Sequence, residues 1–385
     1  MSSLPRPAIT DHDRMLSPAP KNAPLDAALF RRKLSTWYRA HARVLPWRNV
    51  TDPYRTWLSE VMLQQTRVAA VIEHYQHFLR RFPTILALAL APEAEVLASW
   101  SGLGYYRRAR MLHKAAKFVT EELGGALPST SVELRTLPGI GEYTSAAIAS
   151  IAFGESIAVV DGNVERVLLR LTGRPEKRDA SGRAFVQQQA SALVPNRRIS
   201  KRANAAGDHN QAMMELGATI CLPKAPLCLN CPVYSMCRTR GEHLTPPRKV
   251  QLSRPAAYLL SLRKRGTNTE VLLQLRTEDA SLMPGMYELP PLPQDSVQGR
   301  EPMLRLRHAI TNTNYYVQVY APSGPQDRGL RRSVPAAKND LHWIQTNRLA
   351  TRPLTGLTRK VLQRLGVMTV HLPKLPATKT PSHPA

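Results

Sequence analysis

The chain has 385 residues, and its 53 Lys and Arg residues outnumber its 28 Asp and Glu residues, which gives a formal net charge of +25 at pH 7. A surface of this charge binds polyanions such as nucleic acids by releasing their counterions, although an arginine-rich solvated surface would carry the same charge without a partner. No apolar run reaches the roughly 18 residues of a membrane span, and the N-terminal residues MSSLPRPAITDHDRM lack a signal-peptide core. These features argue against membrane and secreted proteins and predict a soluble, cytoplasmic one.

The first predicted segment is a disordered N-terminus, because residues 1–24 contain five prolines and show no hydrophobic period. From about residue 25 to residue 242, apolar residues recur at steps of three and four, as in Ala109, Leu112, Ala116 and Val119. Such spacing is typical of helices. We therefore expect residues 25–242 to form a helical domain.

Two carboxyl residues of this helical region stand in contrasting local sequences. Glu60 lies in the run WLSEVML, where apolar neighbours are expected to raise its pKa, so that it stays protonated near neutral pH and can act as a general acid. Asp161 precedes the predicted helix VERVLLRL, where amide donors and the helix dipole are expected to keep it ionised. Two carboxyls shifted in opposite directions suit cleavage of a glycosidic bond through an oxocarbenium-like state. Taken singly, Glu60 could equally be a surface glutamate and Asp161 a plain helix cap.

The run LPGIGEYT at residues 137–144 matches the hairpin of a helix-hairpin-helix. Gly139 and Gly141 let the backbone turn tightly and bring bare amides close to a phosphate, and the helix that follows adds its partial positive charge. An ordinary turn between helices is the alternative. Further candidate phosphate contacts, or simply solvated cations, are Arg107, Arg108 and Arg110.

The four cysteines of the chain lie within 17 residues in the order C-x6-C-x2-C-x5-C, at Cys221, Cys228, Cys231 and Cys237. Thiolates grouped in this way, with none elsewhere, are typical of a metal or cluster site rather than of a disulfide framework. Structural zinc usually takes two separated C-x2-C pairs, and only one such pair is present. We therefore expect a [4Fe–4S] cluster, with zinc or disulfides as alternatives.

Beyond the cysteines the character of the sequence changes. Residues 243–256 are rich in proline and basic residues, which predicts a linker. The runs AAYLLSLRK, EVLLQL and NYYVQVYA predict strands, and residues 356–365 predict a helix. We expect a smaller α+β domain over residues 257–370 and a disordered, proline-rich tail over residues 371–385.

Several of these motifs together resemble a known family. The cysteine spacing is that of the endonuclease III and MutY group of DNA repair glycosylases. The runs LPWR (45–48), PYRTWLSEVMLQQT (53–66) and GLGYY (102–106) are similar to those of MutY-type adenine DNA glycosylases, densely from about residue 30 to 240 and more loosely beyond. The resemblance implies a mainly α glycosylase domain, with a six-helix barrel, a helix-hairpin-helix and a cluster segment at 221–237, followed by a Nudix/MutT-like domain.

The resemblance also implies an activity. Family members excise adenine mispaired with 8-oxoguanine, and sometimes with guanine, in base excision repair of double-stranded DNA. By resemblance, Glu60 protonates the N7 atom of adenine, Asp161 stabilises or traps the C1′ cation, and Asn163 orients water or the sugar beside it. We expect a monomer that acts in the bacterial cytoplasm at the nucleoid.

Residue matching within the family also assigns the substrate contacts. Gln65 and Tyr105 would wedge into the duplex when adenine is flipped out, a step that costs a few kcal/mol. Outside the family context, Tyr105 would be a core aromatic and Gln65 a solvated helix residue. The adenine pocket would be lined by Trp47, Arg48, Gln211 and Met214.

Tyr143 distinguishes two modes of chemistry within the superfamily. Bifunctional relatives carry at this hairpin position a lysine whose amine attacks C1′ and drives strand scission. A second lysine position, just after the run DGNV, is Glu165 here. We therefore expect base removal with little or no coupled lyase activity. Tyr143 resembles a tyrosine that contacts the active site in several members, and a structural tyrosine is the alternative.

The C-terminal domain is weakly similar to the part of the family that reads 8-oxoguanine on the opposite strand. It lacks the G-x5-E-x7-R-E-x2-E-E helix, so no pyrophosphohydrolase activity is expected. Many members sense the oxidised base with a Phe-Ser-His tip, and the matching residues here are Ile310, Thr311 and Asn312. We expect the Thr311 hydroxyl and the Asn312 amide to act in place of Ser and His.

Two other functions compete with adenine excision. A bifunctional pyrimidine-lesion glycosylase and lyase of the endonuclease III type is opposed by Tyr143 and by the C-terminal domain. A non-catalytic, cluster-bearing DNA-binding protein is opposed by the presence of both Glu60 and Asp161.

Overall fold

The computed structural model describes residues 25–177, 179–196, 204–243, 251–322, 328–335, 337 and 340–369. The predicted disordered ends and residues 244–250 of the predicted linker lie outside the described residues. The chain divides into two compact units, of which one combines Met1–Val61 with Glu122–Arg248 and the other combines Met62–Glu121 with Lys249–Ala385. Among the described residues, no helix has the length and apolar character needed to cross a membrane.

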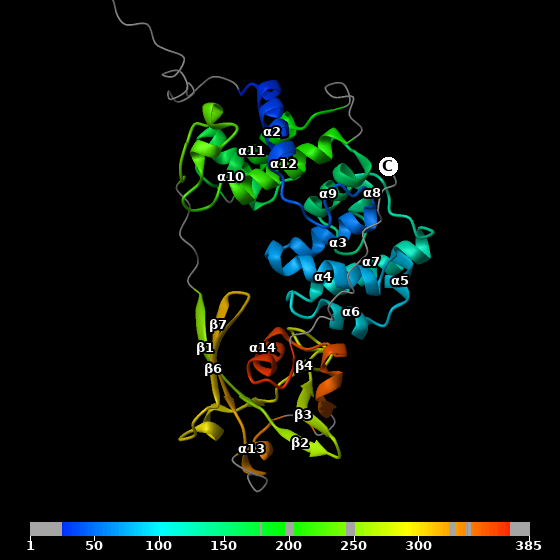
Figure 1. Cartoon of the computed structure of the whole chain (residues 1–385), viewed down its shortest axis with the longest axis vertical. Helices are drawn as coiled ribbons and strands as arrows, with labels where there is room; N and C mark the ends of the chain where they lie inside the picture. Colours follow the sequence, from blue (N-terminus) through cyan, green and yellow to red (C-terminus); the bar gives the residue numbers. More distant parts are fainter. Residues whose placement is uncertain are drawn as a thin grey trace, which may run out of the picture. The chain divides into compact units, whose positions relative to one another are not determined.

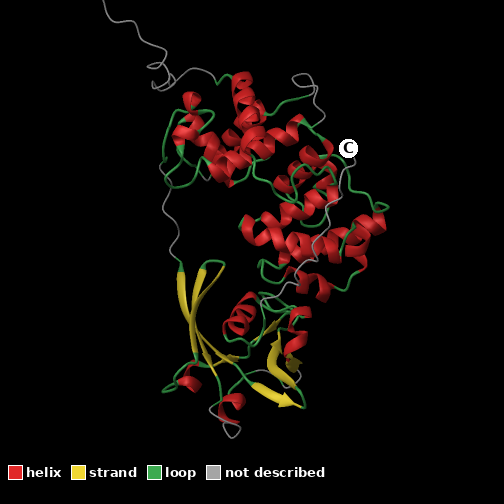
Figure 2. Ribbon diagram, in the orientation of Figure 1, coloured by secondary structure: helices red, strands yellow, loops and turns green. Residues whose placement is uncertain are grey.

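The first unit contains helices and connecting loops (Figures 1 and 2). The central helix, α12, packs against α2, α9 and α10. Apolar side chains at helical spacing account for this arrangement, since Leu216 of α12, Leu34 of α2 and Leu168 of α10 share one buried cluster. The helices are α2 (Ala27–His41), most of α3 (Pro53–Leu63), α8 (Ser131–Leu134), α9 (Glu142–Phe153), α10 (Gly162–Thr172), α11 (Ala180–Leu193) and α12 (Ala205–Thr219).

Two glycines of this unit allow the close backbone geometry at the start of α9 and at the start of α10. Before α9 the chain turns at Gly139, whose φ of 75° lies in the left-handed region that glycine adopts without strain. At α10 the close neighbour is Gly217 of α12, where an added Cβ would lie 2.6 Å from Cβ of Asn163. Only glycine at this position lets α12 approach the N-terminus of α10 so closely.

The second unit joins helices to two four-stranded sheets. One sheet has the order β5-β1-β7-β6, with β1 and β7 parallel, and in the other β3 pairs with β2, β4 and β8, all antiparallel. Its elements are α4 (Val68–Arg81), α5 (Ile85–Leu90), α6 (Glu93–Trp100), α7 (Arg107–Glu122), β1 (Leu252–Leu259), β2 (Leu262–Arg265), β3 (Asn268–Leu275), β4 (Tyr287–Glu288), β5 (Pro291–Leu292), β6 (Leu304–Ile310), β7 (Thr313–Tyr320), α13 (Arg328–Arg332), β8 (Leu341–Gln345) and α14 (Gly356–Arg364).

The predicted strands and the predicted C-terminal helix are confirmed as β1 to β3, β7 and α14. Strand β1 begins at Leu252, inside the segment that was expected to be a linker. Valines of β3 and β7, Val271 and Val317, pack with Val361 of α14 in a common core. The C-terminal region is therefore an α+β fold with its own buried cluster.

Within this unit, the C-terminal residues are hydrogen-bonded to the helices that precede them in the sequence. The hydroxyls of Ser101 and Tyr106 both donate to the carbonyl of Leu354, at 3.1 and 2.9 Å. The guanidinium of Arg359 donates to the Ser101 hydroxyl at 2.9 Å. Residues 101–106 are thus attached to the C-terminal part of the chain.

Candidate active site

Glu60 is buried in the middle of α3, with 5% of its surface exposed. The phenol of Tyr143 donates a hydrogen bond of 2.6 Å to its Oε2 atom. Burial raises the pKa of Glu60 to about 7; the charge of Asp161 acts in the same direction, whereas the Tyr143 hydrogen bond and the charge of Arg48 act against it. A carboxyl group with this pKa is partly protonated at neutral pH and can transfer a proton to a bound base.

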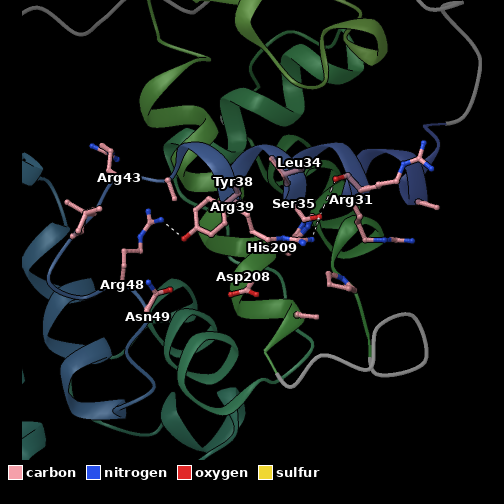
Figure 3. A pocket seen from close by; sticks show the side chains of 18 residues that line it. Arg31, Leu34, Ser35, Tyr38, Arg39, Arg43, Arg48, Asn49, Asp208 and His209 are labelled. Atoms are coloured by element: carbon pink, nitrogen blue, oxygen red, sulfur yellow. Dashed lines mark hydrogen bonds between the residues drawn. The ribbon is translucent and has the colours of Figure 1, made fainter. Parts of the chain in front are cut away.

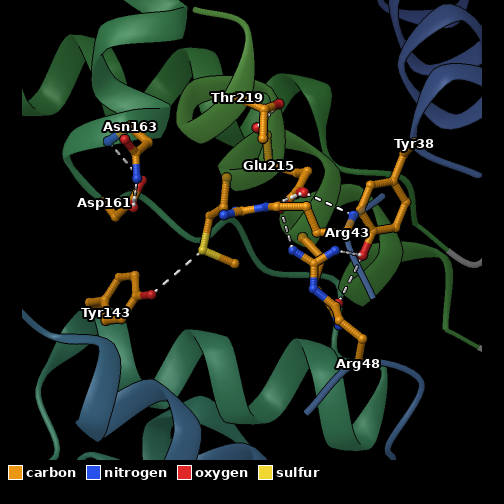
Figure 4. Close-up of polar contacts among 10 residues, drawn as sticks. Tyr38, Arg43, Arg48, Tyr143, Asp161, Asn163, Glu215 and Thr219 are labelled. Atoms are coloured by element: carbon orange, nitrogen blue, oxygen red, sulfur yellow. Dashed lines mark hydrogen bonds and ion pairs between the residues drawn. The ribbon is translucent and has the colours of Figure 1, made fainter. Parts of the chain in front are cut away.

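Tyr143, the second residue of α9, connects Glu60 to α12. Its hydroxyl lies 3.5 Å from the Sδ atom of Met214 (Figure 4). Burial raises the pKa of Tyr143 well above its ordinary value, and the charges of Glu60 and Asp161 reinforce the effect. The phenol therefore stays protonated and serves as a hydrogen-bond donor to the carboxyl group.

Asp161 is the N-cap of α10 and accepts three hydrogen bonds. Its Oδ1 atom accepts from the backbone N–H groups of Asn163 and Val164, at 2.9 and 2.7 Å. Its Oδ2 atom accepts from Nδ2 of Asn163 at 2.8 Å (Figure 4). Three N–H donors fix the orientation of the carboxylate and stabilise its negative charge.

Asn163 is in turn held by Arg166, one turn further along α10. One guanidinium nitrogen donates to Oδ1 of Asn163 at 2.8 Å and to the carbonyl of Gly217 at 2.7 Å. The Nε atom donates to the carbonyl of Cys221 at 2.8 Å. These contacts direct the Asn163 amide toward Asp161 and connect the site to the start of the cysteine segment.

A second buried glutamate, Glu215, lies on α12 and is 1% exposed. Arg43 donates to both carboxylate oxygens, at 2.7 and 2.9 Å, and Arg48 donates to Oε2 at 2.7 Å. Burial alone would raise the pKa of Glu215, but the hydrogen bonds from Arg43 and the charge of Arg48 lower it below its ordinary value. Arg48 also donates to the hydroxyl of Tyr38, which donates to Oε1 of Gln211 at 3.0 Å (Figure 4). Arg48 and Gln211, two of the predicted pocket residues, thus belong to one network.

Arg43 and Arg48 also border a cavity of about 680 Å³ that α2 and α12 help to line (Figure 3). Arg31 and Arg39 contribute further positive charge to its lining. Burial and the charge of Arg31 lower the pKa of His209, another lining residue, to about 4, so its imidazole is neutral at pH 7. The excess of guanidinium groups favours polar or anionic occupants.

The other two predicted pocket residues, Trp47 and Met214, belong to the same unit. Trp47 is 7% exposed and directly precedes Arg48 in the loop between α2 and α3. Met214 packs beside Tyr143 against the buried face of α9. The predicted hairpin glycines, Gly139 and Gly141, are exposed immediately before α9, as a phosphate contact requires.

Four further predicted DNA contacts belong to the second unit and are all exposed: Gln65, Tyr105, Thr311 and Asn312. Gln65, Tyr105 and Thr311 have positive φ angles of 55°, 49° and 52°. Side chains other than glycine rarely adopt this conformation, and such strain concentrates at functional sites. Thr311 and Asn312 form the turn between β6 and β7.

The four cysteines are free thiols, and all are partly buried. Burial raises the pKa of Cys231 to about 12, and the charges of the other three cysteines act in the same direction. Among the described residues, no three His, Cys, Asp or Glu side chains form a group that could hold a metal ion. Arg170 donates to Sγ of Cys221, and the backbone N–H of Arg240 donates to Sγ of Cys237, each at 3.4 Å. N–H donors to two of the sulfur atoms are contacts of the kind that stabilise thiolates in an iron–sulfur site.

Residues 58–191 match the family described as HhH-GPD superfamily base excision DNA repair protein. This part of the chain is therefore similar to the HhH-GPD superfamily. Glu60, Tyr143, Asp161 and Asn163 all lie within the matched residues, so the geometry described above belongs to the matched region. The family resemblance predicted from the sequence motifs is confirmed for this part of the chain.

Two relatives of this chain are named adenine DNA glycosylase. The one from Homo sapiens is 47% identical over 224 residues, which cover 56% of this chain and 40% of the relative. The one from Mycobacterium tuberculosis (strain CDC 1551 / Oshkosh) is 39% identical over 204 residues, which cover 52% of this chain and 64% of the relative. The match thus spans less than two thirds of the length of either relative.

A solved structure, that of a thermostable thymine-DNA glycosylase, is also similar to this chain. It is 28% identical with a TM-score of 0.50, and the match covers 56% of this chain and 96% of that structure. The matched part of the chain therefore has the fold of this solved DNA glycosylase.

Three residues of the site were not singled out from the sequence: Arg43, Glu215 and Arg166. Glu215 stands in the run AMMELG, an apolar setting like that of Glu60, so the same criterion would have found it. Arg43 and Arg166 carry no such signal, because Arg43 pairs with a carboxylate that is distant in sequence and Arg166 bonds largely to backbone carbonyls.

Proposed function

We propose that the chain is a monofunctional adenine DNA glycosylase of base excision repair, which removes adenine paired with 8-oxoguanine or guanine. Relatives named adenine DNA glycosylase support this assignment. One observation carries it: Glu60 is buried with a pKa of about 7 and hydrogen-bonded to Tyr143, while Asp161 of the same unit accepts three N–H donors. This pair provides one proton donor and one anion.

In the proposed reaction, protonated Glu60 donates its proton to N7 of the flipped-out adenine. The bond between C1′ and the base then breaks, and the base leaves without a negative charge. The Asp161 carboxylate stabilises the cationic C1′ atom, or bonds to it, until water adds. A general acid typically contributes about 10²–10⁴ in rate, and a well-placed charge contributes a similar factor.

Asn163 and the pocket residues position the substrate. Asn163 is fixed between Asp161 and Arg166, and so can hold water or the sugar beside the carboxylate. The flipped adenine would lie among Trp47, Arg48, Gln211 and Met214. Arg48 is preset for this role by Glu215, which restrains its guanidinium.

Duplex binding and base flipping rest on other parts of the chain. The amides after Gly139 and Gly141 would hold a phosphate at the start of α9. Gln65 and Tyr105 would enter the duplex at the target pair. The net charge of +25 supports binding of double-stranded DNA, and we propose a monomer acting at the bacterial nucleoid.

The absence of coupled strand cleavage is proposed from two positions. Tyr143 occupies the hairpin position of the bifunctional lysine, and its phenol is engaged with Glu60. Glu165 occupies the second lysine position. Neither residue supplies an amine that can attack C1′.

The C-terminal α+β region would be a Nudix-like domain that reads the base opposite adenine. Thr311 and Asn312 form an exposed turn, and the positive φ of Thr311 is an unusual conformation for a β-branched residue. A hydroxyl and an amide at such a turn offer a donor and acceptors to the oxidised base.

We further propose that Cys221, Cys228, Cys231 and Cys237 hold a [4Fe–4S] cluster. When bound, a cluster of this kind supplies a covalent brace for the segment that follows α12. Purified protein should contain iron and sulfide and absorb near 400 nm, as is general for such clusters, and Cys228→Ser should lose this absorbance. Stoichiometric zinc without iron or sulfide would contradict the proposal.

A pyrimidine-lesion glycosylase is the second candidate, because a solved thymine-DNA glycosylase has the same fold in its HhH-GPD part. One assay separates the two. Duplexes carrying A opposite 8-oxoguanine, G, C or T, and T opposite G, are incubated with the protein and then either heated in alkali or left untreated. We expect adenine release from the first two pairs, with strand breaks only after alkali. Release of thymine, or strand breaks without alkali, would favour the second candidate.

The same assay tests the proposed reader of 8-oxoguanine. If Thr311 and Asn312 bond to the oxidised base, alanine at both positions should shrink the preference for the 8-oxoguanine pair over the guanine pair by about 1–3 kcal/mol, the worth of one good base contact. The single-turnover rate on saturated substrate should hardly change. An unchanged preference would assign the reading to another loop.

A further inference from the structure

Two exposed residues with strained backbones, Gln65 and Tyr105, are held on loops that share one brace. Gln65 follows α3 with a φ of 55°, and Tyr105 precedes α7 with a φ of 49°. Tyr105 has 46% of its surface exposed. An isolated loop would relax such conformations, so neighbouring groups must maintain them.

The brace is Arg108, the second residue of α7. One guanidinium nitrogen donates to the carbonyls of Met62, at 3.1 Å, and of Gln64. The other terminal nitrogen donates to the Thr66 hydroxyl, at 3.1 Å, and to the carbonyls of Leu103 and Gly104, at 3.3 and 3.2 Å. The acceptors of the first loop therefore lie on both sides of Gln65 in the sequence. Those of the second loop directly precede Tyr105.

Aromatic rings complete the arrangement around Arg108. Its guanidinium carbon lies 5.4 Å from the ring centroid of Tyr105 and 5.6 Å from that of Trp100. The indole N–H of Trp100 donates to the carbonyl of Gly104 at 3.2 Å, which restrains the same loop a second time. Burial lowers the pKa of Arg108 to about 10, which still leaves it cationic at neutral pH.

We propose that Arg108 is a positioning residue that presets Gln65 and Tyr105 as one unit for entry into the duplex. The inference rests on the proposed base-flipping function and adds a residue to it. Because its partners are acceptors within the protein, Arg108 acts through the two loops and not as a phosphate contact. Lysine cannot replace it, since a single ammonium group cannot span two loops as the planar fork of arginine does.

Presetting matters because a flipping enzyme must otherwise order both wedge residues at the moment when it unstacks the base. Fixing them beforehand removes that entropy cost from the binding step. Loss of the brace should therefore slow base extrusion and leave general attraction to DNA intact. Protonation of the extruded base by Glu60 should be unaffected.

The test uses a duplex with 2-aminopurine in place of the target adenine, because the fluorescence of this analogue rises when it leaves the stack. Wild-type protein should raise the fluorescence on mixing. Arg108→Lys should slow or reduce the rise by at least about tenfold, the worth of one lost hydrogen bond to a charged group. Thr66→Val, which deletes a single acceptor, should give a smaller loss in the same direction and covers the case in which Arg108→Lys folds poorly.

Two controls separate positioning from general effects. Lys117→Gln removes one charge from the exposed face of the same helix and should leave the fluorescence unchanged, whereas Arg108→Gln should not. In a Gln65→Ala, Tyr105→Ala background, Arg108→Lys should cost much less than in the wild type, because residues that act as a unit are not additive. Urea unfolding of each variant reports any change in fold stability.

The outcomes are distinct. If wild-type protein extrudes the base and Arg108→Lys does so equally well, or if its cost is the same with and without the wedge residues, the positioning role is wrong while the proposed function stands. If wild-type protein neither extrudes 2-aminopurine nor releases adenine, the proposed function fails and this inference fails with it. Additive costs together with lowered stability would leave Arg108 a purely structural residue.

Discussion

Glu60 and Glu215 are two buried glutamates of the same unit, and their pKa values shift in opposite directions. Glu60 is 5% exposed and has the neutral phenol of Tyr143 as its close donor, and its pKa rises to about 7. Glu215 is 1% exposed and is bound by the guanidinium groups of Arg43 and Arg48, and its pKa falls. Burial is common to both, so the partner determines the protonation state. One glutamate is kept as an acid, and the other is kept as an anion that holds two cations in place.

The largest expected difference between Glu60 and Glu215 concerns catalysis. Glu60→Gln removes the proton donor without changing the shape of the side chain, so adenine release should fall by about 10²–10⁴. Duplex binding should remain nearly intact, because Glu60 is buried away from solvent. Single-turnover release from an A:8-oxoguanine duplex measures the first effect and a gel-shift titration the second. Near-wild-type turnover would refute the role of Glu60.

The second difference concerns stability. Glu215→Ala leaves Arg43 and Arg48 without their anion, and breaking a buried pair of this kind costs about 3–5 kcal/mol in the free energy of unfolding. Urea unfolding at neutral pH measures it. Glu60→Gln should show no such loss, because its partner Tyr143 is uncharged. Equal destabilisation by both variants would contradict a difference in charge pairing between the two sites.

Local sequence indicates the apolar setting of both glutamates, but it does not indicate the partners of Glu215. The apolar neighbours of Glu60 and the glycine and helix after Asp161 are readable along the chain, and both predictions of local setting agree with the structure. The network of Glu215 depends on Arg43, 172 positions away in sequence. Nothing in the residues around either partner specifies that pairing.

The same limit applies to the fold and to Arg108. Helices and several strands followed from periodicity and short apolar runs, since these are local properties. The parallel pairing of β1 with β7 is a contact between distant segments and was not predicted. From the sequence, Arg108 was a candidate phosphate contact or a solvated cation, but four of its five acceptors described above are backbone carbonyls, which every sequence possesses. Its role becomes visible only when the two loops are placed together.

The third prediction uses the opposite pKa shifts as a stability test. Because the pKa of Glu60 is raised from 4.5 to about 7, folding favours its protonated form. That stabilisation is complete below pH 4.5 and is lost as pH rises through 7, by about 3 kcal/mol in total. The Glu60→Gln variant should not lose stability in this way as pH rises, and at pH 8.5 it should be more stable than the wild-type protein. Glu215, with a lowered pKa, has the reverse sign: its contribution is present above pH 4.5 and is lost on acidification.

Urea unfolding at pH 5.5 and 8.5 compares the two directly. Wild-type protein should lose stability between these values relative to Glu60→Gln. If both proteins have the same pH dependence, Glu60 is not protonated in the folded state at pH 5.5.

The smallest effect isolates the hydrogen bond between Tyr143 and Glu60. The phenol donates to the carboxylate and so opposes the rise of the Glu60 pKa. Tyr143→Phe removes that donor, so the pKa should rise further, and a net hydrogen bond of about 1 kcal/mol corresponds to roughly 0.7 pKa unit. Adenine release requires protonated Glu60, so its decline at alkaline pH should move upward by the same amount. A pH profile of the single-turnover rate for the wild-type protein and for Tyr143→Phe measures this displacement. An unchanged plateau of the rate at acidic pH is the internal control. A downward displacement would mean that Tyr143 stabilises the neutral acid, because its oxygen accepts a hydrogen bond from the protonated carboxyl group of Glu60.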